Sequence, residues 1–450
     1  MKNLLIISEY FAPNNAIASI RVTKLAKYFK LNKNYHITVV SRKLSENEII
    51  DPILYDDLKY ADKHIVIDYS KAIYNILDIR KRLTKIKDDK INAEIFIESE
   101  NKTVRNKIYS KFLSFIRNNI NNYIGFRVLK NYVKSAVKNI KKNHKNFDVI
   151  LSSYGPYSSY IIGTLLKKYE PKSIWIADFR DPVVFCCCIS EKYDEYCLSY
   201  LKKTAKSADI LTGVSDACTK YFEKQNKHKI YTICNGFDRD DIKDIKITTK
   251  DKFIMTYAGI LYSGKRDLSI IFEVVRELIA ENKIDKNNII INYAGSDEIE
   301  FKNQIEKYSL IETVQFHGFI DRQQSLQLQF DSSMLLLASW NSIGETGVVT
   351  GKYLEYMMMN KPIVCTVTGN LPNSQLKEMI TAANNGVVWE EANNESDYPL
   401  LKTYILDQYE RFMRNEPLMF EPNMEYIEQY NYKNITQQFI DLIENNAKRK

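Results

Sequence analysis

Short apolar runs alternate with amphipathic stretches along most of the chain. Several of these runs are continuous in Val, Ile and Leu rather than alternating, which is typical of parallel strands covered on both faces. In the first half the predicted strands are NLLIIS, HITVVS, HIVIDY, DVILSS, SIWIADF, ADILTGV and KIYTICN. In the second half they are FIMTYAG, IIINYAG, TVQFHGF, SMLLLAS and KPIVCTV.

The stretches between these runs predict helices. Over Asp267–Asn282, for example, apolar residues recur at intervals of three and four. Alternating strands and helices of this kind predict an α/β protein built from βαβ units. The charged segment Asp238–Lys252 separates the two sets of strands and is predicted to be a linker. We therefore expect two doubly wound, Rossmann-like domains at about 1–240 and 250–425, followed by a C-terminal helix over 426–450.

The composition is that of a globular protein, with 45% apolar and 12% aromatic residues. The seven cysteines include no C-x-x-C pair, and three of them are consecutive at Cys186–Cys188. This spacing suits neither a disulfide framework nor a zinc site, so we expect reduced, structural thiols. Charged residues interrupt every apolar run before the ~20 residues that a membrane span needs. The first apolar run is too short for a signal peptide, and we expect a cytoplasmic protein.

The net charge of +8 is unevenly distributed. The segment Lys71–Lys145 contains 19 Lys and Arg against 6 Asp and Glu, so it carries +13 and the rest of the chain −5. Part of it, Asn106–Lys142, is amphipathic at helical spacing. A solvated helical face or an ordinary core helix would explain the pattern, as would peripheral attachment to an anionic membrane through about 102–142. Nucleic acid is a weaker alternative because no known binding module is present.

One candidate site for an anion lies in the loop Gly344–Gly351, GETGVVTG, between a predicted strand and a predicted helix at Lys352–Met359. Glycines let backbone N–H groups approach a phosphate, and the start of a helix attracts negative charge. Thr350 is placed to cap that helix. Glu355 would direct a carboxylate toward the same end, where the two hydroxyls of a ribose could bind it. Alternatively, Lys352 and Glu355 form an i,i+3 surface pair and the glycines serve turns.

A second strand-to-helix junction, Tyr257–Ser269, places Lys265 and Arg266 beside Gly259 and Gly264. Two cations at such a junction could neutralise a leaving diphosphate. Together the two junctions predict a site for a nucleotide-diphosphate sugar in the second domain.

Several motifs resemble those of GT-B glycosyltransferases of the retaining family 4, especially members that act in bacterial surface-polysaccharide assembly. They lie at Glu9–Phe29, Asp148–Val183, Val314–Ser339 and Gly351–Val364, so the resemblance spans almost the whole chain. It implies two domains facing across a cleft, with the final helix returning to the first. It also implies sugar transfer from a nucleotide-diphosphate sugar, commonly a UDP-sugar, to a glycan or lipid-linked acceptor, without a cofactor or metal.

The resemblance also implies roles for individual residues. Glu355 aligns with the glutamate that holds the ribose, and Lys265 and Arg266 with the cations that bind the diphosphate. The donor-binding residues would be Gly259, Glu345, Thr346, Gly347, Thr350, Gly351, Lys352 and Glu355. The catalytic residues would be Lys265, Arg266, Asp178 and Asp181, and the acceptor-binding residues Asn15, Ser19, Arg21 and Arg180.

The chain departs from the family pattern at three places. The family has a second glutamate eight residues before Glu355, where this chain has Gly347, and Glu345 lies ten before. The segment Asn14–Ser19 replaces a Gly-Gly pair, and Val183 replaces a tryptophan. Two alternatives stay open. A sugar-nucleotide 2-epimerase of the same fold would share the nucleotide site, and the missing glutamate suggests a non-catalytic scaffold of a polysaccharide-assembly complex.

Two further features have plain structural interpretations. The triplet Asp238–Asp240 has the spacing of a D-x-D metal motif, but in a linker we expect it to be solvated. His317 could contact the donor or be a structural histidine with a satisfied ring.

Overall fold

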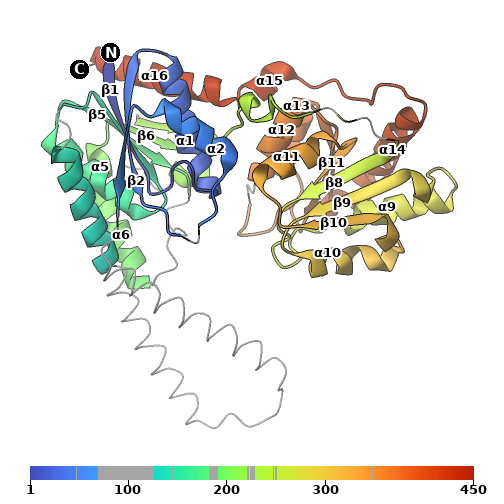
Figure 1. The fold of residues 1–450 in the computed structure, drawn as a ribbon. Helices are drawn as coiled ribbons and strands as arrows, with labels where there is room; N and C mark the ends of the chain where they lie inside the picture. Colours follow the sequence, from blue (N-terminus) through green and yellow to red (C-terminus); the bar gives the residue numbers. More distant parts are fainter. Residues whose placement is uncertain are drawn as a thin grey trace, which may run out of the picture. The chain divides into compact units, whose positions relative to one another are not determined.

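A computed structural model describes residues 1–46, 48–68, 126–142, 146–181, 191–219, 222, 229–246, 248, 251–346 and 349–449. The chain forms two compact units (Figure 1). The first consists of Met1–Ile50, Leu54–Cys234 and Gln438–Lys450. The second consists of Asp51–Ile53 and Asn235–Gln437.

The first unit contains a seven-stranded sheet in the order β3-β2-β1-β4-β5-β6-β7, in which every pairing is parallel. Its strands are β1 (Lys2–Ile7), β2 (Tyr35–Arg42), β3 (Lys63–Ile67), β4 (Val149–Tyr154), β5 (Ile174–Phe179), β6 (Ile210–Gly213) and β7 (Ile230–Thr232). Its helices include α1 (Ile17–Leu31), α2 (Pro52–Asp57), a helix over 126–142, α5 (Tyr157–Tyr169), α6 (Glu191–Thr204) and α7 (Asp216–Thr219). All residues of β4 and β5 are buried, as expected for central strands covered on both faces.

The second unit contains a six-stranded parallel sheet in the order β10-β9-β8-β11-β12-β13. Its strands are β8 (Phe253–Ala258), β9 (Ile289–Ala294), β10 (Val314–Gly318), β11 (Met334–Trp340), β12 (Ile363–Thr368) and β13 (Gly386–Glu390). Its helices are α9 (Ser269–Ala280), α10 (Glu298–Ile305), α11 (Arg322–Phe330), α12 (Gly351–Met359), α13 (Gln375–Ala383), α14 (Asn394–Met413) and α15 (Met424–Glu428). A short helix, η5 (Arg239–Ile242), precedes them.

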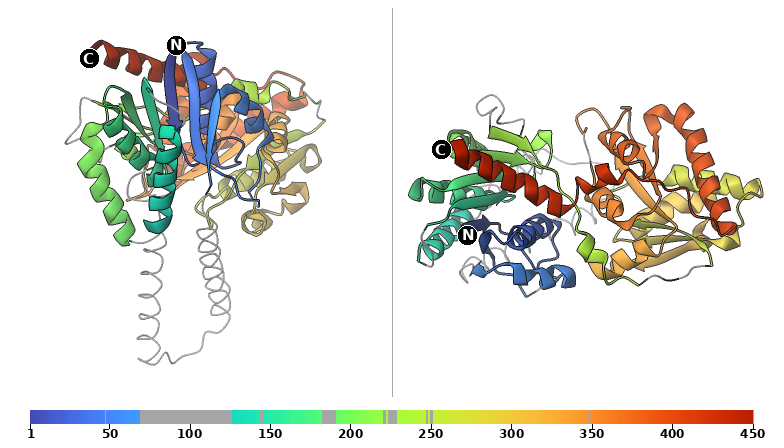
Figure 2. Two further views of the ribbon diagram at one scale, coloured as in Figure 1. Left: turned by 60° about the vertical axis from the view of Figure 1, so that its left-hand side comes forward. Right: turned by 90° about the horizontal axis from the view of Figure 1, so that it is seen from above.

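The last helix, α16 (Tyr432–Arg449), begins in the second unit and ends in the first. Its apolar residues Phe439 and Ile443 are fully buried. The guanidinium of Arg21 on α1 lies 5.5 Å from the centre of the Phe439 ring. Both ends of the chain therefore lie in the first unit, as Figure 2 shows.

The prediction of two doubly wound domains and a returning C-terminal helix is confirmed. All the strands predicted from the sequence are present, and one strand, β13, was missed. Its apolar part is only Val387–Trp389, between two asparagines and a pair of glutamates, so the pattern is too short to recognise. β13 pairs only with β12, at the edge of the sheet.

The helix over 126–142 lies in the basic segment and tests the membrane alternative for that part. Its apolar residues Leu129, Tyr132, Val133, Ala136 and Ile140 belong to the core of the first unit. The apolar face is therefore covered by protein, as in an ordinary core helix. The rest of the basic segment, 71–125 and 143–145, lies outside the described residues.

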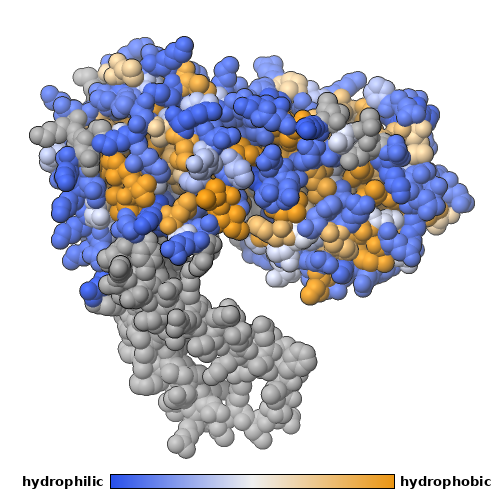
Figure 3. Space-filling view, in the orientation of Figure 1, coloured by the Kyte–Doolittle hydropathy of each residue, from blue (hydrophilic) through white to orange (hydrophobic). Residues whose placement is uncertain are grey.

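The polar surface and the mostly buried thiols are those of a globular protein. Polar side chains dominate the face in Figure 3, with smaller apolar groups between them. Among the described cysteines, Cys197, Cys218 and Cys365 are buried and Cys234 half-buried, all as free thiols; Cys186–Cys188 lie outside the described residues. Within the part of the chain that the structure describes, no helix combines the length and apolar character that a bilayer span requires.

Candidate active site

The candidate donor site lies at the carboxyl ends of β8 and β11 in the second unit. These two strands are neighbours, although β9 and β10 come between them in the sequence. The loop after β8 leads toward α9, and the loop after β11 leads toward α12. In a doubly wound sheet this is the switch point, where the two loops diverge and leave room for a ligand.

The loop after β8 has an unusual backbone. Tyr262, Ser263 and Gly264 all have positive φ, at 51°, 53° and 82°. Such a conformation is uncommon for non-glycine residues and is frequent at functional sites. Thr366 and Thr368 of β12 hold the next residues, because their hydroxyls donate to the carbonyls of Asp267 (2.6 Å) and Lys265 (3.0 Å).

Lys265 and Arg266 extend from this turn in different surroundings. The ammonium of Lys265 lies 2.8 and 2.9 Å from the two carboxylate oxygens of Glu345, and both side chains are half-exposed. The guanidinium of Arg266 stacks over Tyr262, 4.5 Å from the ring centre. Hydrogen bonding from Lys265 is the main cause that lowers the pKa of Glu345. The two cations predicted from the sequence therefore lie at the switch point, and one of them already has an anionic partner.

The loop after β11 approaches from the neighbouring strand. Ser342 and Glu345 close a tight turn through the bond from Glu345 N–H to the Ser342 carbonyl (2.9 Å), and Gly344 between them has a φ of 87°. Thr346 is exposed, and Gly347 lies outside the described residues. Gly351 begins α12 and is exposed, with open space where a Cβ would be.

The prediction that Thr350 caps α12 is confirmed. Its side chain accepts a hydrogen bond from the backbone N–H of Tyr353. The helix ends at Asn360, which adopts the left-handed conformation common just beyond a helix.

Glu355 lies one turn inside α12, and its side chain is 14% exposed. It accepts hydrogen bonds from Lys352 (2.8 Å) and from the amide of Gln329 on α11 (2.7 Å), and Arg322 lies 3.9 Å away. Burial alone would raise the pKa of Glu355, but the two cations outweigh it, so the pKa is lowered and the carboxylate is charged. The i,i+3 pair with Lys352 is present, but it is not a simple surface pair, because the Glu355 carboxylate is mostly buried and also accepts from Gln329.

Arg322, whose side chain is 12% exposed, was not among the residues selected from the sequence. It contacts Asp241 (2.7 Å) and lies 3.8 Å from Asp51. Burial opposes its charge, but the acids Asp241, Glu355 and Asp51 raise its pKa further above the usual value. Arg322 thus fixes the start of α11 and stabilises the charge of Glu355.

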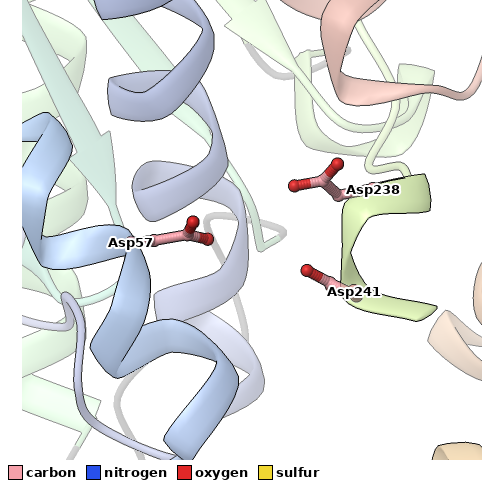
Figure 4. Close-up of side chains that lie close together, drawn as sticks. All are labelled: Asp57, Asp238 and Asp241. Atoms are coloured by element: carbon pink, nitrogen blue, oxygen red, sulfur yellow. The ribbon is translucent and has the colours of Figure 1, made fainter. Parts of the chain in front are cut away.

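The expectation that the D-x-D triplet is solvated is confirmed for Asp240, which is exposed, and is wrong for Asp238. Asp238 is 1% exposed and accepts a hydrogen bond from Asp240 N–H at the start of η5, and Asp241 holds Arg322. Figure 4 shows Asp238 and Asp241 at the two ends of this short helix. It also shows Asp57 at the end of α2 in the first unit, where Lys24 donates to it (2.6 Å). Residues after Asn235 therefore pack within the second unit and do not form a free linker.

His317 on β10 contacts the side-chain oxygen of Asn292 on the neighbouring strand β9 (3.0 Å). Burial lowers the pKa of its ring, which is therefore neutral near pH 7. This pairing supports the structural interpretation of His317.

In the first unit, Arg21 and Asp178 face each other at the carboxyl end of β5. Two hydrogen bonds join them at 2.8 and 2.9 Å, and their side chains are 2% and 0% exposed. The hydroxyl of Thr212 donates to the same carboxylate (2.8 Å), and Arg21 also donates to the carbonyls of Ile233 and Cys234. In this structure neither side chain of the pair is accessible to a substrate. Its burial favours a positioning role over the catalytic and acceptor-binding roles implied by the resemblance.

Arg180 binds the backbone of the surrounding loops. It donates to the carbonyls of Ala18 (2.7 Å), Tyr154 (3.2 Å) and Gly155. Asp181 is exposed, and one of its carboxylate oxygens would lie 2.5 Å from a Cβ at Gly155, so no side chain fits there; the φ of 109° at Gly155 also favours glycine.

The remaining residues expected to bind the acceptor lie before and within α1. Asn15 is half-buried, and its N–H donates to the Ile49 carbonyl (3.1 Å). Ser19 is fully buried. Glu9 was not predicted; it lies after β1 and accepts a hydrogen bond from Ser158, at the start of α5 after the neighbouring strand β4. Glu9 and Asp181 are thus carboxylates at the loop end of the first sheet.

Comparison with known proteins identifies the class of the second unit. Residues 238–415 match the family model described as "Glycosyl transferases group 1". No curated protein matches the chain.

Solved structures resemble the whole chain. A sucrose-phosphate synthase from Thermosynechococcus elongatus is 14% identical with a TM-score of 0.58, covering 100% of both chains. The TarM G117R mutant of S. aureus, in complex with Fondaparinux, alpha-GlcNAc-glycerol and UDP, is 12% identical with a TM-score of 0.54, covering 98% of this chain and 100% of that one. A putative UDP-N-acetylglucosamine 2-epimerase from Listeria monocytogenes is 11% identical with a TM-score of 0.52, covering 100% and 98%.

At such low identities these likenesses show the fold alone. The chain has the GT-B fold of two Rossmann-like domains. The match to the model of glycosyl transferases group 1 lies within the second unit, and the candidate donor site described above lies inside the matched residues.

Proposed function

We propose that the protein is a retaining glycosyltransferase. It moves a sugar from a nucleotide-diphosphate sugar, a UDP-sugar, to a glycan or lipid-linked acceptor in cell-surface polysaccharide synthesis. The observation that carries the proposal is the grouping of Lys265, Arg266 and charged Glu355 in a domain that matches a glycosyl transferase family. UDP is named because the resemblance to family 4 implies it, and TarM of the same fold is described in complex with UDP.

Each part of the donor has a matching group in the second unit. Lys265 and Arg266 would bind the diphosphate and stabilise the charge that develops as it leaves, which can contribute ~2.7–4 kcal/mol for one such donor. The exposed start of α12 would add backbone N–H groups and a favourable dipole. Glu355, held charged by Lys352 and Arg322, would accept the ribose hydroxyls.

The acceptor would bind to the first unit. The loops after β1 and β4 meet at the switch point of that sheet, where Ser158 holds Glu9. Asp181 adds an exposed carboxylate to the same end of the sheet, and carboxylates are suited to bind the hydroxyl groups of a sugar.

Calorimetric titration of UDP into the parent and Glu355→Gln tests the donor site. The neutral amide cannot replace the charged acceptor, and a lost hydrogen bond to a charged group predicts about 10- to 100-fold weaker binding. Glu410→Gln is the matched control, because Glu410 on α14 is half-exposed and pairs with Arg414, the residue just after that helix (3.2 Å). Equal affinity of parent and Glu355→Gln would contradict the assigned role.

Incubation with UDP-sugars then separates the possible activities. Transfer predicts sugar-dependent release of UDP that rises with an added acceptor, and a product with the anomeric configuration of the donor. Conversion of a UDP-sugar to its 2-epimer without acceptor would instead favour the epimerase alternative. Binding without either reaction across a panel of acceptors would favour the non-catalytic scaffold.

A further inference from the structure

Trp340, the last residue of β11, was not among the predicted site residues, yet its ring lies beside both candidate phosphate-binding cations. The ammonium of Lys265 lies 5.3 Å from the centre of the ring, and the guanidinium of Arg266 lies 6.0 Å from it. The ring of Tyr262 packs against Trp340 at 5.8 Å. Two aromatic rings and two cations thus form one group around the switch point.

This group has N–H donors without acceptors. Nε1 of Trp340 and Nε of Arg266 are buried, and neither has a hydrogen-bond acceptor of good geometry among the described residues. Buried N–H groups are nearly always paired in folded proteins, because an unpaired one loses its hydrogen bonds to water without replacement. The two groups lie at the carboxyl ends of the parallel strands, so both are available to an acceptor that a ligand supplies.

Glu345 already places an anion at this group. Its carboxylate lies against the ammonium of Lys265, and the nearby indole of Trp340 helps to lower its pKa. The residue itself is carried by the tight turn from Ser342 to Glu345, which is exposed. The pair with Lys265 is also half-exposed on both sides, so it is a weak interaction that a ligand can replace.

We propose that the Glu345 carboxylate occupies the position of a donor phosphate group, with Lys265 and Trp340 as the residues that bind that phosphate. Trp340 is then a donor-binding residue, whose indole N–H donates to a phosphate oxygen. Glu345 is an internal competitor that must move away when the nucleotide sugar binds. This inference rests on the proposed function, since it deepens the assignment of the same site, and it replaces the donor-sugar contact that the resemblance implied for Glu345.

The charges favour displacement. Two negative groups cannot share one ammonium without repulsion, and a diphosphate carries more negative charge than one carboxylate. Glu345 can leave this position, because its side chain makes no hydrogen bond or ion pair with any described side chain outside this group. Removing the competing charge therefore raises affinity, whereas removing the indole N–H lowers it.

The test is calorimetric titration of UDP and of inorganic pyrophosphate into four proteins: the parent, Glu345→Gln, Trp340→Phe and Glu312→Gln. Glu345→Gln is expected to bind both probes about two- to fivefold more tightly, the range of an exposed ion pair. Trp340→Phe keeps an aromatic ring, loses the N–H and is expected to bind about tenfold more weakly. Glu312→Gln is the control, because Glu312 forms a similar exposed pair with Lys286 (2.8 Å) away from the site and should leave affinity unchanged.

Tryptophan fluorescence gives a second readout that a purely structural role would not move. The other tryptophans, Trp175 and Trp389, are buried, so a change of emission on adding UDP is expected in the parent and Glu345→Gln and absent in Trp340→Phe. Far-UV circular dichroism verifies that Trp340→Phe is folded. If it is not, Glu345→Gln and the fluorescence of the parent decide the question.

The outcomes separate the two proposals. Unchanged or weaker binding by Glu345→Gln, or unchanged binding by Trp340→Phe, overturns this inference while UDP binding by the parent leaves the proposed function standing. A parent that binds neither UDP nor pyrophosphate overturns both.

Discussion

Replacing Asp178 with asparagine removes one charge from the buried pair that it forms with Arg21. The new side chain has nearly the same shape, so the change tests charge rather than packing. In the parent, both oxygens of Asp178 accept from Arg21, and Thr212 donates to one of them. In the variant, one of these two oxygens remains as an uncharged acceptor and the other becomes an amide NH2 group that faces the guanidinium, while the carbonyls of Ile233 and Cys234 still accept from Arg21.

The expected loss is large because Arg21 remains charged and 2% exposed. Removing one partner of a buried ion pair typically costs about 3–5 kcal/mol, since the other charge stays buried without compensation. For a unit of about 200 residues, each kcal/mol lowers the melting temperature by about 2–4 °C. Asp178→Asn should therefore lower the melting transition of the first unit by roughly 6–20 °C.

Differential scanning calorimetry measures this for each unit. Added UDP identifies the transition of the second unit, which should be the same in parent and variant. The double variant Arg21→Met/Asp178→Leu is the control: an apolar pair of similar volume leaves no unpaired charge, so its loss should be well below the sum of the two single losses. A variant that melts within about 2 °C of the parent but has lost sugar transfer would refute the positioning role and restore Asp178 as a catalytic residue.

Three further changes test the packing and the charges of each unit. Gly163→Ala should lower the melting temperature of the first unit, although alanine favours helices, because its Cβ would lie 2.5 Å from Nε1 of Trp175; overpacking typically costs about 1–3 kcal/mol, and calorimetry would detect it. Hydrogen bonds, chiefly from Arg42, lower the pKa of Glu48 from 4.5 to about 2. The contribution of Glu48 to stability is therefore present above pH 4.5 and is lost as the pH falls toward 2. Glu48→Gln should flatten the acid branch of a stability–pH curve for the first unit. Burial would raise the pKa of Glu390, but bonds from groups such as Ser374 N–H (2.7 Å) outweigh it and lower the pKa, so Glu390→Gln should flatten the acid branch for the second unit only.

The strands can be predicted well from the sequence, because parallel strands that are covered on both faces consist of unbroken apolar runs. SMLLLAS and KPIVCTV became β11 and β12 almost residue for residue. The edge strand β13 lacks such a run, since its apolar part is only the three residues Val387–Trp389. The cap at Thr350 and the end of that helix at Met359 could be predicted equally well, because helix caps depend on neighbours within a few residues.

The partners of the charged residues could not be predicted in the same way. Arg21 and Asp178 are 157 positions apart, and only the folded sheet brings them together. Lys265 and Glu345 lie 80 positions apart on loops that the switch point joins. A motif can therefore give the position of a charged residue in the fold, but its exposure and its partner depend on contacts that are remote in the chain.

The crossing of α16 into the first unit has a consequence for biosynthesis. The part of the first unit that buries Phe439 and Ile443 is made by residues before Cys234, but the helix that carries these two side chains is translated only after residues 235–437. At about 5–20 residues per second, the nascent first unit waits roughly 10–40 s with that apolar surface open to water. During this interval it is a natural client for chaperones, and the second unit can reach its native state before the first.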